Sequence, residues 1–153
     1  MAYSAFKVVH LFGVIVFLGN IIVTAVWKTL ADRTGDRRVI AYAQRLVTVT
    51  DWAFTAGGAV LIVIGGYGMA LTARFDLHQT WLLWGQALFV LSGLIWVGVL
   101  IPTQMAQARE ARVFASGDPI PESYWRHVRR WAIWGAIATI VPLANLYFMV
   151  FKP

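Results

Sequence analysis

Four long apolar runs constrain this chain more than any other feature of its sequence. They cover residues 4–27, 52–73, 79–101 and 131–151. About 20 mainly apolar residues are needed to cross the roughly 30 Å hydrocarbon core of a bilayer. In lipid such runs are helical, because unpaired backbone groups find no water there. We therefore predict an all-α fold, in which residues 1–153 form a single transmembrane domain, a bundle of four membrane-spanning helices.

Composition supports this class and excludes several others. Hydrophobic residues make up 59% of the chain and charged residues 13%, whereas a soluble domain is about 45–50% apolar and about 25% charged. The absence of cysteine excludes disulfides, thiolate metal sites and a cysteine nucleophile. The net charge of +6 does not indicate nucleic acid, because the basic residues lie between the apolar runs rather than on a soluble basic face.

The distribution of basic residues predicts the orientation. Ten of the 13 lysines and arginines fall in the connections 28–51 and 102–130, and only Lys7, Arg74 and Lys152 fall on the opposite side. Because loops rich in lysine and arginine stay in the cytoplasm, both connections are expected there and both termini outside. The expected location is a bacterial inner (cytoplasmic) membrane, crossed several times by the chain.

The connections differ in length and pattern. Between spans two and three only residues 74–78 remain, which predicts a tight antiparallel hairpin. Connection 28–51 has apolar residues at helical spacing with arginines between them, which predicts a short amphipathic helix. This helix either extends span two or lies on the membrane surface. The apolar positions are Val39, Ile40, Ala43, Leu46 and Val47.

Polar side chains at membrane depth usually face protein or a water-filled cavity, and they mark candidate functional sites. Two groups are expected, one in each half of the bundle. The outer group comprises Lys7, His10, Thr72, His78, Gln79, Gln86 and Asn145. The inner group comprises Asn20, Thr24, Asp51, Thr55, Gln104 and His127.

Among the three histidines, His10 is the most informative, because it lies about two turns inside the first span. An imidazole at that depth can pack and hydrogen-bond across helices, carry protons, or ligate haem iron. His78 lies at the outer mouth of span three, and His127 lies among arginines at the cytoplasmic side. Only His10 is well placed for bis-histidine ligation, so five-coordinate haem or a different sixth ligand stays open.

No enzyme class is indicated by motif. The chain has no P-loop and no GxSxG, HExxH or CxxC sequence. The sequence therefore indicates neither catalytic residues nor an enzymatic activity.

The stretch Phe6-Lys7-Val8-Val9-His10-Leu11-Phe12-Gly13, followed by Leu18-Gly19, resembles the Lys-x-x-His opening of small bacterial four-helix membrane proteins. These include HemJ-type protoporphyrinogen oxidases and CopD-like copper-resistance proteins. Residues 101–104 and 149–153 resemble more closely a related family of predicted integral membrane proteins of unknown function.

The resemblance implies a four-helix bundle and a haem b ligand at His10. HemJ-type proteins also carry a lysine within the bundle and an arginine late in the first span. Neither has a counterpart here, because the second span has no lysine and no arginine at depth follows Gly19-Asn20. The resemblance therefore extends to haem binding and not to protoporphyrinogen oxidation.

The first functional hypothesis is a haem b-binding protein that transfers electrons or serves as a membrane redox subunit. His10 would ligate the iron, and His78, Lys7, Gln86 and Asn145 would complete the cofactor site. A quinone or a redox protein is the expected partner, and a homo-oligomer would provide more room for the cofactor. The alternatives are a small transporter or a non-catalytic accessory subunit whose polar interior carries protons, ions or a solute, and a plain scaffold.

Overall fold

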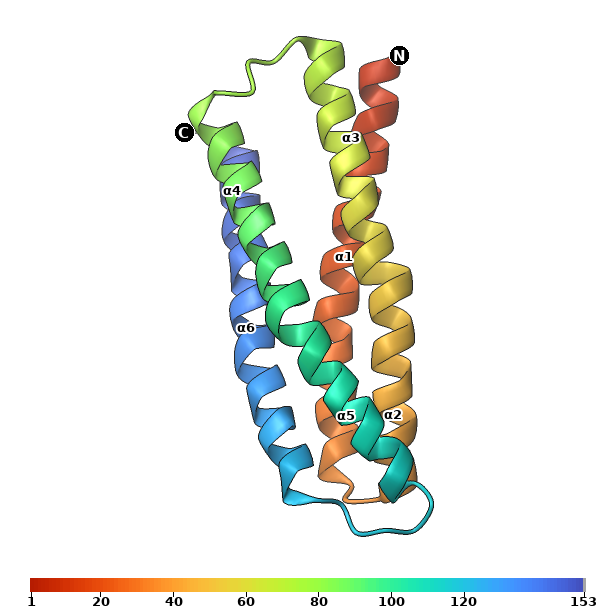
Figure 1. Ribbon diagram of the computed structural model, residues 1–153. Helices are drawn as coiled ribbons and strands as arrows, with labels where there is room; N and C mark the ends of the chain where they lie inside the picture. Colours follow the sequence, from red (N-terminus) through yellow and green to blue (C-terminus); the bar gives the residue numbers. More distant parts are fainter. Residues whose placement is uncertain (153) are drawn as a thin grey trace.

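The computed structural model describes residues 1–152, which form a long bundle of helices (Figure 1). The elements in chain order are α1 (Ala2–Arg33), α2 (Arg37–Thr50), η1 (Asp51–Ala56), α3 (Gly57–Ala73), α4 (Thr80–Ile95), η2 (Trp96–Leu100), α5 (Ile101–Phe114) and α6 (Glu122–Phe151). The two η segments are π-helical and join their neighbours without interruption.

These elements form four long apolar helices within the described residues, each sufficient to cross a membrane. They are Ala2–Arg33, Arg37–Ala73, Thr80–Phe114 and Glu122–Phe151. The predicted all-α, four-span fold is confirmed. The amphipathic stretch after residue 36 extends span two, because α2, η1 and α3 form one continuous helix of 37 residues.

Specific residues start and end the helices. The Asp36 carboxylate accepts hydrogen bonds from the backbone N–H groups of Arg38 and Val39, and so begins α2. Gly35, with φ of +65°, turns the chain immediately before it. At the other end of the second span, Arg74 adopts the left-handed conformation and closes α3.

The bundle consists of two helix pairs, and these do not follow the expected hairpin. α3 packs along α1, and α4 packs along α6 (Figure 1). No Cα atom of the described helix α3 lies within 8 Å of one in α4. The prediction of a tight hairpin between spans two and three is therefore wrong: the short connection joins α3 to α4 without packing them together.

Glycine explains why α3 prefers α1. A Cβ atom added at Gly65 would lie 2.4 Å from the backbone nitrogen of His10, and one at Gly13 would lie 2.8 Å from the backbone nitrogen of Ile62. Side chains larger than hydrogen would therefore separate these backbones. Close approach through small residues is the usual way for helices to associate in lipid, where hydrophobic burial provides no net attraction.

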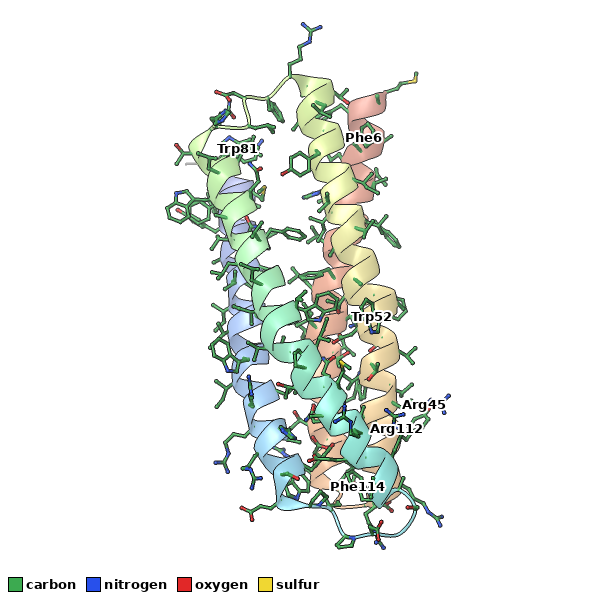
Figure 2. The ribbon with its side chains drawn as sticks, viewed as in Figure 1. Phe6, Arg45, Trp52, Trp81, Arg112 and Phe114 are labelled. Carbon is green, nitrogen blue, oxygen red and sulfur yellow. The ribbon has the colours of Figure 1, made fainter. Side chains whose placement is uncertain are left out.

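The two ends of the molecule differ. We name the end with both termini and the α3–α4 connection the terminal end, and the end with residues 34–36 and 115–121 the basic end. At the basic end α1, α2, α5 and α6 surround a well-packed core. Its buried residues are Ile40, Ala111, Phe114 and Tyr124. Figure 2 shows Phe114 at this end, Arg45 and Arg112 somewhat closer to the middle, and Trp81 at the terminal end.

Candidate functional site

A buried carboxylate is the centre of a hydrogen-bond network in the half of the bundle nearer the basic end. Asp51, only 8% exposed, accepts hydrogen bonds at Oδ1 from Asn20 Nδ2 (3.2 Å) and Thr55 Oγ1 (3.0 Å). Its Oδ2 accepts one from Gln104 Nε2 (2.5 Å). Asn20 Nδ2 also donates to Thr55 Oγ1 (2.9 Å), and Thr24 Oγ1 donates to Asn20 Oδ1 (3.2 Å). Three helices thus contribute to one polar cluster, which we name the Asp51 cluster.

The local helix geometry positions this cluster. On α1, Asn20 and Thr24 are four residues apart and so lie on one face. Asp51 is the first residue of the π-helical segment η1, and Thr55 is its last residue but one. A π-helical turn contains one more residue than an α-helical turn and is often found at functional sites. Both buried residues of η1 belong to the cluster.

A cavity of about 530 Å³ lies against the Asp51 cluster. Its volume falls in the range of small-molecule sites, roughly 300–1,000 Å³. The polar residues of its wall are Thr24, Thr29, Asp51, Thr55, Ser92, Gln104 and Thr139. The rest is mainly apolar and aromatic, and includes Phe17, Ile21, Trp96, Leu100 and Trp131.

The second π-helical segment faces the same cavity. Trp96 and Leu100 of η2 line it. Trp96 packs edge-on against Trp52, with ring centroids 5.9 Å apart, and its buried Nε1 has no hydrogen-bond partner among the described residues. Figure 2 shows Trp52 near the middle of the bundle, so the cavity that Trp96 lines lies there and not at either end.

A second buried polar group ties α1 to α6 at the basic end. Lys28 Nζ lies 2.5 Å from both carboxylate oxygens of Asp32 and 2.9 Å from the hydroxyl oxygen of Tyr124. Tyr124 in turn donates to Asp32 Oδ1 (3.2 Å). Lys28 is 1% exposed and Tyr124 is fully buried. Because every charge here has a partner, this triad is suited to holding the helices together.

The candidate haem ligand His10 faces α3. Its Nδ1 lies 2.9 Å from the carbonyl oxygen of Ile62, and a Cβ added at Gly66 would lie 3.3 Å from the same nitrogen. An Nδ1–H that donates to a carbonyl leaves Nε2 as the acceptor, which is the arrangement commonly found for histidine ligands. His10 therefore fits a single axial ligand.

The other four residues predicted for the cofactor site form no hydrogen bond with His10 within the described residues. Lys7 is exposed on α1, and His78 is exposed in the α3–α4 connection. Gln86 accepts a hydrogen bond from the Tyr67 hydroxyl (2.9 Å), and Asn145 Nδ2 donates to the carbonyl of Gly85 (3.0 Å). Within residues 1–152 no hydrogen bond connects any two of the five candidates.

The position of His78 does not fit bis-histidine ligation. Its side chain is 87% exposed, and its Nδ1 lies 3.2 Å from Asp76 Oδ1. The backbone N–H of His78 also donates to that carboxylate, which holds the pKa of Asp76 below its usual range. Across residues 1–152 no three histidine or acidic side chains gather in a metal-binding group. Neither the cavity beside Asp51 nor a smaller cavity lined by Asp32 and Arg33 includes any of the five candidates in its wall.

Most residues of the predicted inner polar group lie together in the structure. Five of the six predicted residues belong to the Asp51 cluster. The sixth, His127, lies apart from it, and its Nδ1 is 3.3 Å from Glu110 Oε2. Trp96, Asp32 and Tyr124 were not predicted from the sequence. A signal for Asp32 exists, because Asn20, Thr24, Lys28 and Asp32 recur every four residues.

Comparison with protein families agrees with this architecture. Residues 4–153 match the family described as "Predicted integral membrane protein (DUF2269)". The chain belongs to this family. The predicted membership in a family of integral membrane proteins of unknown function is thereby confirmed, and contact with the lipid bilayer follows from it. No curated protein and no solved structure matches this family member.

Proposed function

We propose that this DUF2269 protein binds a lipophilic cation in the cavity beside Asp51, as a small transporter or solute-binding subunit of the membrane. The observation that carries the proposal is a buried carboxylate without a counter-ion on the cavity wall. Asp51 accepts three hydrogen bonds, all from neutral groups. Within residues 1–152 no basic side chain forms a salt bridge with it.

The energetics favour a positively charged ligand. A carboxylate near hydrocarbon loses hydration, and removing it from water is expensive unless an opposite charge compensates. For this reason ionisable residues within membrane spans commonly mark pathways of ions or charged substrates. Contrast with Lys28 supports this interpretation, since that charge is neutralised by Asp32 at 2.5 Å. Asp51 is the acidic group that a bound cation would neutralise.

The rest of the wall suits the same ligand. Phe17, Trp96 and Trp131 line the cavity, and aromatic rings attract quaternary ammonium groups through their negative π-clouds. The apolar side chains beyond them accept a hydrocarbon chain. An alkyltrimethylammonium ion combines both features, with a head for Asp51 and the aromatic rings and a tail for the apolar wall.

The experiment measures binding of decyltrimethylammonium to the purified protein in lipid nanodiscs by titration calorimetry. Wild type is expected to bind at least tenfold more tightly than Asp51→Asn, which preserves the shape of the side chain but removes its charge. Asp51→Glu is expected to restore part of the affinity. Asp118→Asn is the matched control, because it removes one exposed acidic charge far from the cavity.

A neutral analogue separates charge from shape. Replacing the trimethylammonium head by a tert-butyl head retains the size and removes the charge, so its binding is expected to be equal in wild type and Asp51→Asn. Equal affinity of both proteins for the cation would contradict the proposal. Absence of saturable cation binding in correctly folded wild type would contradict it as well.

We also propose that the basic end faces the cytoplasm of a bacterial inner membrane. Arginines concentrate on α2, α5 and the first turns of α6 at this end, and loops rich in lysine and arginine are retained in the cytoplasm. The Asp51 cavity would then lie in the inner half of the bilayer. Both termini would lie outside.

A second candidate function is haem b binding with His10 as axial ligand, for electron transfer with a quinone or a redox partner. The hydrogen bond between His10 Nδ1 and the Ile62 carbonyl favours it, because it leaves Nε2 available for iron. As part of this candidate function, we propose that the chain is related to HemJ-type and CopD-like proteins. Reduced-minus-oxidised spectra of protein made with ample haem test it: a Soret and an α band are expected, and both are expected to vanish in His10→Ala. A colourless folded protein would contradict it.

A further inference from the structure

The wall of the Asp51 cavity is incomplete between α1 and α6. Several residues that line the cavity are also exposed on the outer surface of the bundle. On α1 these are Ile22 (47% exposed) and Val26 (56%), and on α6 Ile140 (63%). These exposed side chains lie at the edge of the cavity, which we interpret as the rim of an opening. The rim is apolar and lies on helices that cross the membrane, so the opening faces lipid.

Small side chains keep this opening wide. Ala25 on α1 and Ala132, Gly135 and Ala136 on α6 all line the cavity. A Cβ added at Gly135 would have no atom within 4 Å other than those of its own helix backbone and chain neighbours. The glycines of the α1–α3 contact differ from it, since there the backbones touch. Between α1 and α6 small residues therefore leave space, and they do not serve close packing.

We propose that the cavity is loaded sideways from the bilayer through the opening between α1 and α6, and that its ligand is a single-chain cationic amphiphile. This inference rests on the proposed function. The cationic head would reach Asp51, and the hydrocarbon tail would remain in the opening among Ile22, Val26 and Ile140. A molecule of this class partitions into the membrane before it binds, so the bilayer supplies the protein with ligand.

A second cavity adjoins the first and is less suited to admit a cation. A smaller cavity of about 260 Å³ lies towards the basic end and shares Thr29, Trp131 and Ala132 with the first. Its wall includes Arg33, and Asp32 in this wall is already paired with Lys28. The field of the arginine-rich end repels a cation approaching from water. The lipid-facing opening has no basic residue among its lining residues.

The test compares association rates for three single tryptophan substitutions. Ala136→Trp places a large ring in the lipid-facing opening, and Ala144→Trp is its matched control, an exposed alanine of the same helix that does not line the cavity. Arg33→Trp fills the second cavity. The probe is a bromoalkyl trimethylammonium ion, which quenches tryptophan fluorescence in a stopped-flow experiment with nanodiscs. Each variant is also made with Asp51→Asn, and only the difference between the two traces is analysed.

We expect Ala136→Trp to slow the Asp51-dependent association at least tenfold, with Ala144→Trp and Arg33→Trp at the wild-type rate. An unchanged rate in Ala136→Trp would overturn sideways loading, and so would slow association in Arg33→Trp alone, which would assign the route to the basic end. Failure of the proposed function gives a different result, because wild type and Asp51→Asn would then show identical traces.

Discussion

Two buried charges in this bundle, Asp51 and Lys28, have different surroundings. Asp51 is held by amide and hydroxyl donors on the wall of a cavity, whereas Lys28 is enclosed with Asp32 and Tyr124 in a complete set of partners. A buried charge that already has a counter-ion has no remaining demand for a ligand. The paired Lys28 therefore suits a structural role, and Asp51 is the residue to which we assign recognition of the proposed ligand.

Replacing Lys28 by methionine is expected to destabilise the protein by about 3–5 kcal/mol, because the Asp32 carboxylate would remain buried without its partner. The double variant Lys28→Met with Asp32→Leu should recover most of that loss, since no unpaired charge remains. The free energy of unfolding, measured by steric trapping in bicelles, checks both. Lys7→Met, at an exposed position of the same helix, should stay within about 0.5 kcal/mol of wild type. Equal effects at the two lysines would contradict a structural role for the triad.

Among the helices, the glycines and the π-helical segments have different structural effects. Glycines bring α1 and α3 into backbone contact, which explains why α3 pairs with α1 and not with its chain neighbour α4. The segments η1 and η2 lie within the continuous second and third long helices, and both contribute residues to the cavity. The glycines thus bring two helices together, whereas the π-helical segments contribute to the wall of a cavity.

Gly65→Ala is expected to lower the free energy of unfolding by about 1–3 kcal/mol. The new methyl group would lie 2.4 Å from the backbone nitrogen of His10, so α1 and α3 would have to move apart to accommodate it. Gly57→Ala is the matched control in the same helix, as its Cβ would have no atom within 4 Å outside its local backbone. It should be neutral or stabilising by up to about 1 kcal/mol through helix propensity. Thermal unfolding in detergent measures both. Similar melting temperatures for the two variants would refute the close contact.

The whole molecule is longer than a bilayer is thick. A helix of 32 residues, the length of α1, extends about 48 Å at 1.5 Å per residue, while the hydrocarbon core measures about 30 Å. We propose that the excess of roughly 18 Å extends beyond the hydrocarbon at the basic end, where α2 and α5 carry arginines and pack around Phe114 and Tyr124. Towards the terminal end the two helix pairs separate (Figure 1).

Single cysteines test the orientation proposed for this arrangement, because the natural chain contains none. In intact spheroplasts a membrane-impermeant maleimide is expected to label His78→Cys in the α3–α4 connection and to leave Ser116→Cys in the α5–α6 connection unlabelled. Inside-out vesicles should give the reverse pattern, since the basic end is then exposed to the reagent. Labelling of Ser116→Cys in intact spheroplasts would contradict a cytoplasmic basic end.

The four membrane helices follow from the apolar runs alone, because runs of this length have no other stable form in lipid. The sequence also indicated the amphipathic extension of span two and most of the inner polar residues, since helical periodicity assigns residues to faces. Which faces meet is decided only in the tertiary structure. Proximity along the chain suggested that span three would pack on span two, but the backbone contact at Gly65 commits α3 to α1. That pairing, together with η1 and η2, directs Asp51 and Trp96 to one cavity and leaves His10 outside it. Such convergence depends on contacts between residues distant in the chain, which the pattern along any single helix does not contain.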